Sequence, residues 1–265
     1  MTIPKVIHYC WFGGKPLPDK VKTMVASWHK MCPDYKIIQW NESNYDYNKN
    51  QYMKDAYKEK KWAFVADYAR LDIVYNYGGI YLDTDVELIK SLDKLLNSHA
   101  FFALEKQNTN ISTGLGFGAE KGNIHIKHLL AIYESISFYN KNGELNLTPC
   151  TTYTTEYFKS IGYICENRNQ LIDNIQIYSW EYFCPIDFKT GKIEVTEKTI
   201  GIHWYDASWL SDSDKRINEI EKKIRTQMPS KIAVIMCFIY RKSYRLQEYI
   251  KKGILLNKIR NKIFR

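Results

Sequence analysis

The stretch that decides the fold reads Ala63-Phe-Val-Ala-Asp67-Tyr-Ala-Arg70-Leu-Asp-Ile-Val-Tyr-Asn-Tyr-Gly78-Gly79-Ile-Tyr81-Leu-Asp83-Thr-Asp85. Apolar residues recur at helical spacing (i, i+3, i+4, i+7 and i+11) from the residue just before it, at Trp62, Val65, Ala66, Ala69 and Ile73. The glycine pair Gly78-Gly79 predicts the end of this helix. The next three residues, 80–82, predict a short strand that runs directly into Asp83-Thr-Asp85.

Outward from this stretch, strand-like and helix-like segments alternate along the chain. Three further strands are predicted and three further helices, the strands at 6–12, 35–40 and 100–104 and the helices at 19–30, 49–60 and 124–138. The pattern weakens after residue 150, where we expect strands at 175–178 and 192–202 and a helix from Ser213 onward. The alternation predicts an α/β domain, a central sheet with layers on both sides.

The two carboxylates of Asp83 and Asp85 are the sharpest chemical feature. At the end of a strand they can reach one hard cation together with a sugar or ribose, and Mg²⁺ and Mn²⁺ prefer such oxygen ligands. The carboxyl ends of strands are also the usual ligand position in open α/β sheets. Asp-x-Asp pairs are common, and taken alone this one is more simply a turn of solvated acids, so the motif by itself does not decide between the two interpretations.

Asp67 and Arg70 add a second pair of charges to the same region. They lie three residues apart, on one face of the predicted helix and at the polar edge of its apolar stripe. Because the helix turns through the glycine pair into the Asp83 strand, we expect these charges and both aspartates to share one cleft. An arginine can hold phosphate or sugar hydroxyls there. The alternative is a local surface ion pair of little energetic value.

Taken together, this stretch resembles the sugar-binding region of the DXD glycosyltransferases, which form glycosyltransferase family 32. That family includes yeast-type initiating mannosyltransferases and many bacterial capsule and lipopolysaccharide enzymes, and the large clostridial glucosylating toxins share the pattern. The resemblance implies a GT-A type fold with a central, mostly parallel sheet, a bound Mn²⁺ or Mg²⁺, and a retaining hexosyl transfer. The donor it favours is a UDP-hexose carrying galactose or glucose, with an N-acetylated relative or GDP-mannose left open.

The resemblance also implies a role for each residue of the motif. Asp85 would be the direct metal ligand, and Asp83 would contact ribose or donor sugar and a metal-bound water. Asp67 and Arg70 would hold the hydroxyls of the donor sugar, and Tyr81 would flank the donor.

Two more segments fit the same family. In Val6-Ile-His-Tyr-Cys-Trp11-Phe-Gly13-Gly14, Trp11 would stack on the nucleotide base. In His203-Trp-Tyr-Asp-Ala-Ser208-Trp209, either His203 or Ser208 would supply a further metal ligand, and Trp209 would support the departing diphosphate. Taken alone, Trp11 and His203 are read more simply as core side chains. The glycine-rich segment 112–120 would border donor and acceptor, with no residue assigned.

Composition excludes several other classes of protein. The hydrophobic share of 45% and the charged share of 25% are ordinary for a globular chain, which rules out disorder as the main state. The six cysteines form no CxxC pair, so a zinc site of four thiolates is not expected. No apolar leader begins the sequence, and its longest apolar run, 232–240, is far shorter than the ~20 residues of a spanning helix. We therefore expect a cytoplasmic protein with reduced thiols.

The positive charge is concentrated at the C-terminal end. Residues 215–265 carry 15 Lys/Arg and three Glu, a net +12, whereas the rest of the chain is at −3. We divide the chain into a GT-A catalytic domain, 1–212, and a basic helical tail, 213–265. Leu246, Tyr249, Ile250 and Ile254 recur there at helical spacing among basic residues. This pattern predicts a peripheral protein on the anionic inner face of the cell membrane, where an undecaprenyl-diphosphate-linked saccharide would be the acceptor. A helical cap or a dimer contact is the alternative.

Two other functions remain as alternatives. A nucleic-acid-binding protein would use the basic tail, but the sequence carries no RNP, zinc-finger or helix-turn-helix signature, so we expect no nucleic-acid partner. A phosphatase with an Asp-x-Asp nucleophile would leave Arg70 and the glycine pair without a role.

Overall fold

The computed structural model describes residues 3–206 and 212–251, which fall into two units. The first unit contains residues 3–187 and 193–206, and the second contains 188–192 and 212–251. The division of the chain at residue 212 stays a prediction of the sequence.

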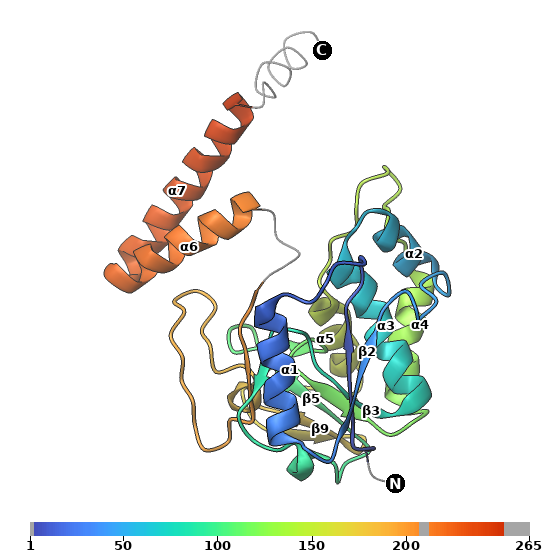
Figure 1. Ribbon diagram of the computed structural model, residues 1–265. Helices are drawn as coiled ribbons and strands as arrows, with labels where there is room; N and C mark the ends of the chain where they lie inside the picture. Colours follow the sequence, from blue (N-terminus) through green and yellow to red (C-terminus); the bar gives the residue numbers. More distant parts are fainter. Residues whose placement is uncertain (1–2, 207–211, 252–265) are drawn as a thin grey trace. The chain divides into compact units, whose positions relative to one another are not determined.

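An eight-stranded sheet organises the first unit, in the order β2-β1-β3-β7-β5-β9-β8, with β6 paired to β5 outside this path (Figure 1). The strands are β1 (Val6–Cys10), β2 (Lys36–Trp40), β3 (Gly79–Tyr81), β5 (Ala100–Leu104), β6 (Ile111–Ser112), β7 (Phe117–Ala119), β8 (Gln170–Ile172) and β9 (Ile175–Tyr178). β2, β1 and β3 are parallel, as are β5 and β9, and β7 is antiparallel to both β3 and β5. β6 and β8 are also antiparallel to their neighbours. Five strands therefore point one way and three the other, which confirms the expected α/β class with a mostly parallel sheet.

Two apolar cores lie on opposite faces of this sheet, because successive side chains of a strand point to opposite faces. Phe102 of β5 joins a core formed with one group of helices, α2 (Gln51–Lys58), α3 (Trp62–Tyr77), α4 (Ile124–Ser135) and α5 (Cys150–Ser160). Phe101, its neighbour, joins the other core, which α1 (Asp19–Met31) covers. That core also includes the apolar residues of β4 (Val86–Leu88), which pairs with β10 (Gly201–His203) in a small sheet. The short helices η1 (Asp93–Leu95) and η2 (Trp180–Tyr182) border it.

The central helix α3 is as predicted in extent but not in burial. It ends at Gly78, whose φ of 67° favours glycine, and Gly79 follows at φ 104°. A Cβ on Gly79 would lie 2.7 Å from the Val6 carbonyl oxygen, so the chain can enter β3 here only with glycine. The expected polar edge of α3 is wrong, because every residue from 64 to 74 is buried. The sheet contacts one side of the helix and α2 and α4 contact others, so residues 64–74 have no edge left to solvent.

Other differences from the sequence prediction lie where local patterns are weakest. The strand expected at 192–202 is confined to β10, since only its last residues pair with β4. Helix α5 was not predicted, because its buried face is built largely from threonines rather than from an apolar stripe. Strand β7 was not predicted either, since it lies in the glycine-rich segment 112–120.

The second unit contains a pair of helices, α6 (Asp212–Gln227) and α7 (Ser230–Lys251). Ile217 of α6 and Ala233 and Cys237 of α7 are buried. Arg241 of α7 makes a two-pronged ion pair with Glu221 of α6, at 2.8 and 3.0 Å. Across 3–206 and 212–251, no helix combines the length and the apolar character needed to cross a membrane.

One buried histidine of the sheet gives the fold a testable pH dependence. His8 in β1 is 1% exposed; its Nε2 lies 2.9 Å from the Gly78 carbonyl oxygen, and its Nδ1 accepts from Trp40 Nε1 at 3.1 Å. The ring is therefore neutral, and a proton added to Nδ1 would face another N–H. Burial lowers the pKa of His8 to about 4, although the bond to Gly78 opposes the shift.

Because the pKa of His8 is depressed in the folded state, the unfolded chain takes up the proton first, near pH ~6.5. The stabilisation is complete above that pH and is lost as the pH falls toward 4. We expect the wild type to lose about 1.4 kcal/mol of unfolding free energy per pH unit in this window beyond what His8→Gln loses. Urea unfolding of both proteins at several pH values measures this, and parallel pH profiles would contradict it.

Candidate active site

The turn after β3 places both aspartates of the motif at the carboxyl end of the parallel strands. The Asp83 backbone N–H donates to the Gly114 carbonyl at 3.2 Å, and the Val86 N–H donates to the Asp83 carbonyl at 3.1 Å. These bonds close a tight turn between β3 and β4. The turn fixes the two carboxylates at the sheet edge where open α/β sheets bind ligands.

The small sheet brings His203 to these aspartates from more than a hundred residues away. β10 is antiparallel to β4, and the register sets His203 opposite Val86, the residue after Asp85. His203 Nε2 then lies 3.2 Å from Asp85 Oδ1, and the Trp204 N–H donates to the Asp85 carbonyl at 2.9 Å. Candidate ligand atoms of Asp83, Asp85 and His203 all lie within 4.8 Å of one another.

Arg70 joins the helix to this cluster. Its Nη2 lies 3.0 Å from Asp67 Oδ1 and 3.3 Å from Asp83 Oδ1, and its Nε donates to the Ala66 carbonyl at 3.1 Å. The side chain of Arg70 is 4% exposed, that of Asp67 9% and that of Asp83 28%. The expected surface-pair alternative is therefore wrong: the ion pair forms the buried floor of the site, and Asp83 is the more exposed of the two carboxylates that contact Arg70.

Burial and neighbouring charges shift the pKa values of the cluster in different directions. Burial raises the pKa of Asp83, with Arg70 opposing the shift and Asp85 adding to it. Burial would also raise the pKa of Asp85, but His203 and hydrogen bonds such as the one from the Asp206 N–H outweigh it and lower that pKa. Burial lowers the pKa of His203, and Asp85 reverses this, so the net shift is upward. Asp85 is therefore the carboxylate that stays ionised most firmly.

The donor set fits a divalent metal ion. Two carboxylates and an imidazole are ligand types that Mn²⁺ accepts, and Mg²⁺ takes the oxygens. Within the described parts of the chain, His203 Nδ1 is buried without a hydrogen-bond partner. A buried ring nitrogen left unpaired is costly, and a bound ligand would remove that cost.

The other predicted site residues have different outcomes. The Tyr81 ring lies beneath the Arg70 guanidinium, 5.1 Å from it, and is fully buried. Trp11 follows β1 at the same sheet edge, is half-buried, and donates from Nε1 to the Lys15 carbonyl at 2.7 Å. Ser208 and Trp209 lie outside the described residues. The structure thus brings together Asp67, Arg70, Tyr81, Asp83, Asp85 and His203, and their roles stay predictions.

Four residues that sequence reasoning did not assign also lie at the site. A Cβ on Gly114 would be 2.4 Å from Asp83 Oδ2, so only glycine leaves room for that carboxylate. Thr113 accepts a long bond from Arg70 at 3.5 Å, and Cys150 contacts Asp67. Glu105 follows β5 near His203, and burial raises its pKa. The glycine-rich pattern around Gly114 and the strand before Glu105 were the available signals.

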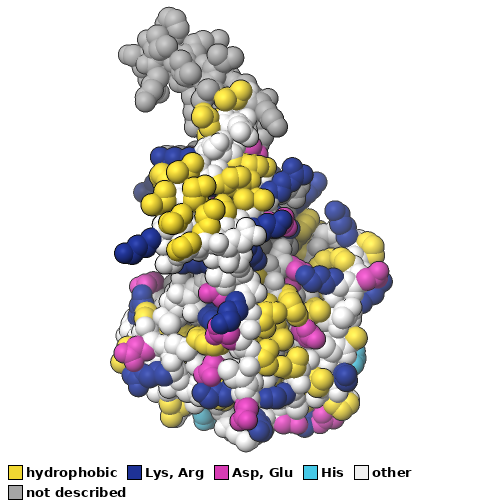
Figure 2. Space-filling model, turned by 90° about the vertical axis from the view of Figure 1, so that its left-hand side faces the viewer, with side chains coloured by type: hydrophobic (Ala, Val, Ile, Leu, Met, Phe, Trp, Pro, Cys, Tyr) yellow, Lys and Arg dark blue, Asp and Glu magenta, His cyan; other side chains and the backbone are white. Residues whose placement is uncertain are grey.

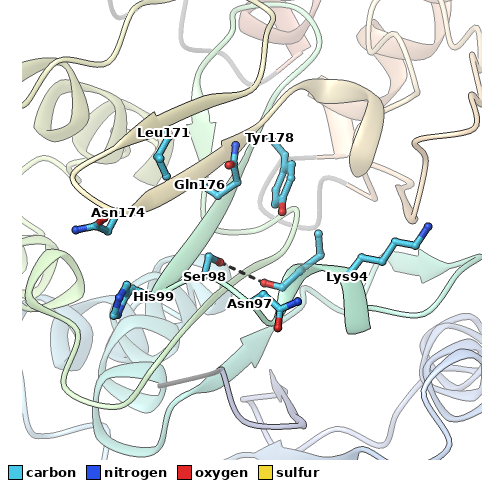
Figure 3. Close-up of a pocket in the computed structure, with 9 residues that line it drawn as sticks. Lys94, Asn97, Ser98, His99, Leu171, Asn174, Gln176 and Tyr178 are labelled. Atoms are coloured by element: carbon cyan, nitrogen blue, oxygen red, sulfur yellow. Dashed lines mark hydrogen bonds between the residues drawn. The ribbon is translucent and has the colours of Figure 1, made fainter.

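A pocket of about 300 Å³ lies between residues 94–99, which come just before β5, and the β8–β9 hairpin (Figure 3). His99 precedes β5 and Asn174 precedes β9, and Tyr178 and Gln176 of β9 also line it. None of the predicted site residues contributes to it, so this pocket is separate from the acidic cluster.

Comparisons with known proteins match the central region. Residues 18–102 match the family described as "Glycosyltransferase sugar-binding region containing DXD motif". Inositol phosphoceramide mannosyltransferase 3 of Schizosaccharomyces pombe is 34% identical over 108 residues, covering 38% of this chain and 29% of that protein. Mannosyl phosphorylinositol ceramide synthase CSH1 of Saccharomyces cerevisiae is 27% identical over 221 residues, covering 81% of this chain and 57% of that protein. The match therefore spans less than a third of the first of these relatives and just over half of the second.

Similar solved structures carry low sequence identity. PaToxG glycosyltransferase is similar with a TM-score of 0.48 and 19% identity, covering 60% of this chain and 70% of that one. A glycosyltransferase involved in glycosylation of the major capsid of PBCV-1 has a TM-score of 0.47 and 11% identity, and the match covers 82% of this chain and 98% of that one.

Proposed function

We propose, from the premise that residues 18–102 are a DXD-type glycosyltransferase sugar-binding region, that this chain transfers a hexose from a nucleotide sugar in a metal-dependent reaction. The observation that carries the proposal is the cluster of Asp83, Asp85 and His203 next to the buried Asp67–Arg70 pair. The cluster suits a metal ion with a bound diphosphate, and the Asp67–Arg70 pair suits sugar hydroxyls.

The chemistry divides among the residues as follows. Asp83, Asp85 and His203 would hold the metal, which supplies a Lewis acid for the charge that develops on the leaving diphosphate. Arg70 and Asp67 would orient the donor sugar by hydrogen bonds from the floor of the site, and Trp11 would stack on the base. Retention of anomeric configuration belongs to the same proposal, as an expectation from the family resemblance.

The donor and the acceptor are proposed at the level of class. The sequence favours UDP-galactose or UDP-glucose. The names of the two relatives, a mannosyltransferase and a mannosyl phosphorylinositol ceramide synthase, favour a mannose donor as the second candidate. We propose a lipid-linked saccharide as acceptor, carried on undecaprenyl diphosphate in surface-polysaccharide synthesis. The enzyme would then act as a peripheral protein at the inner face of the membrane.

Thermal unfolding with a panel of nucleotide sugars tests the proposal. UDP-galactose, UDP-glucose, UDP-N-acetylglucosamine and GDP-mannose are each added with and without Mn²⁺. A donor at about 100 times its Kd stabilises by about 2.7 kcal/mol, which raises the midpoint by roughly 5–10 °C. We expect one donor to do so only with the metal. If none shifts the midpoint either with or without Mn²⁺, the site does not bind these nucleotide sugars and the proposal fails.

A further inference from the structure

Helix α7 leaves a row of large apolar side chains exposed on the second unit. Ile235 is 60% exposed, Phe238 60% and Ile239 52%, and Ile232, Leu246 and Ile250 are similarly exposed. Figure 2 shows hydrophobic side chains gathered on this helix with Lys and Arg beside them. At 100° per residue, most of these positions fall on one side of the helix, opposite the buried Ala233 and Cys237 that face α6.

The basic residues of α7 between residues 230 and 250 divide into two groups. Arg241 forms an ion pair with Glu221 of α6. Arg245 forms one with Asp214 of α6 and one with Glu248 of α7 itself. Both arginines are therefore used within the helix pair. Lys231 and Lys242 have no ion-pair partner in the described part of the chain and lie beside the apolar row, Lys242 at 4.6 Å from the Phe238 ring. The lysines are therefore the positive charges of α7 that are available to an external partner.

The spacing of the row distinguishes a bilayer from a second copy of the chain. Residues 232, 235, 239, 242, 246 and 249 would form the seam of a coiled coil, and Lys242 would be buried at its centre. Two copies would also bring together two segments of net charge +12. In a membrane interface, by contrast, a lysine extends its ammonium group to the headgroups while its stem stays apolar, and anionic lipid attracts the charge.

We infer that the exposed face of α7 is a docking surface for an anionic phospholipid bilayer, with the helix lying in the interface and its isoleucines and Phe238 inserted. The inference deepens the proposed membrane location by assigning it to one helix face. It rests on the proposed function only in that a lipid-linked acceptor explains why the protein would bind a membrane. The docking itself requires no sugar transfer.

Co-sedimentation of the full chain with vesicles tests the docking surface. Vesicles of phosphatidylcholine containing one part in three phosphatidylglycerol should bind the protein far better than pure phosphatidylcholine, and added salt should weaken the binding. Ile235→Glu/Ile239→Glu should lower the partition coefficient at least tenfold, because two apolar side chains can no longer leave water. Lys231→Gln/Lys242→Gln should lower it by about 25-fold, about fivefold for each lysine.

Matched controls keep the result interpretable. Leu171→Glu/Val195→Glu introduces the same charges at apolar residues of the first unit that are 70% and 54% exposed, and should bind vesicles as the wild type does. Unchanged helical circular dichroism verifies that the α7 variants are folded. Equal vesicle binding by the wild type and the α7 isoleucine variant would overturn the inference. So would a wild type that binds no vesicles but forms a dimer, if the isoleucine variant is a monomer. The nucleotide-sugar shifts should be unaltered in these variants, so a failure of docking and a failure of the proposed transfer are distinguishable.

Discussion

Replacing Asp85 with alanine should abolish the Mn²⁺-dependent stabilisation by the donor and lower kcat/KM for sugar transfer by about 10³-fold or more. Asp85 is the carboxylate whose pKa is lowered, it contacts His203 at 3.2 Å, and it is central to the cluster. Stabilisation of the leaving diphosphate by a metal is worth several kcal/mol, and each 1.36 kcal/mol is tenfold in rate. Thermal shifts with donor and Mn²⁺ measure the binding part without relying on turnover.

Two control variants separate metal binding from local structure. Asp85→Asn keeps an oxygen that can accept from the Asp206 N–H at the same place, but loses the charge, and should behave like the alanine variant. Asp34→Ala removes an aspartate that is 57% exposed and forms a surface ion pair with Lys5, and should leave donor binding and transfer unchanged. A wild-type Mn²⁺ response in either Asp85 variant would place the metal elsewhere.

Much of the fold around the site follows from local sequence. The period of α3, the glycine pair that ends it and the short strand before Asp83 each depend on neighbours within a few residues, so their signals are in the sequence itself. Local signals alone therefore predict the carboxyl end of β3 correctly.

The rest of the site depends on contacts between distant segments. His203 reaches Asp85 only through the register of β10 on β4, which no local period encodes. The requirement for glycine at 114 arises from the Asp83 carboxylate of the neighbouring segment, not from the backbone conformation of Gly114 itself. The burial of Arg70 follows from the elements packed around α3. A hydrophobic pattern assigns charged residues to the solvent side of a helix, so it wrongly predicts Arg70 at the surface.

Arg70→Met should destabilise the protein by about 3–5 kcal/mol at pH 8, in addition to losing transfer. The guanidinium is the cation for two carboxylates, and its removal leaves the buried Asp67 without a compensating charge. Arg70→Lys keeps the charge but cannot span Asp67, Asp83 and the Ala66 carbonyl with one planar group, so we expect a smaller loss. Arg168→Met, at an exposed pair with Glu166, should cost less than about 1 kcal/mol.

The loss in Arg70→Met should also depend on pH, in a direction that tests its cause. Burial already raises the pKa values of Asp67 and Asp83 while Arg70 opposes the shift, so removing Arg70 raises both further. A carboxyl whose pKa is higher in the folded than in the unfolded state binds its proton preferentially when folded, and stability falls as the pH rises through this range. The difference in unfolding free energy between variant and wild type should therefore be larger at pH 8 than at pH 5. Urea unfolding at both values measures it. A difference that is the same at both would mean that lost packing of the Arg70 side chain, rather than unpaired charge at the floor of the site, causes the destabilisation.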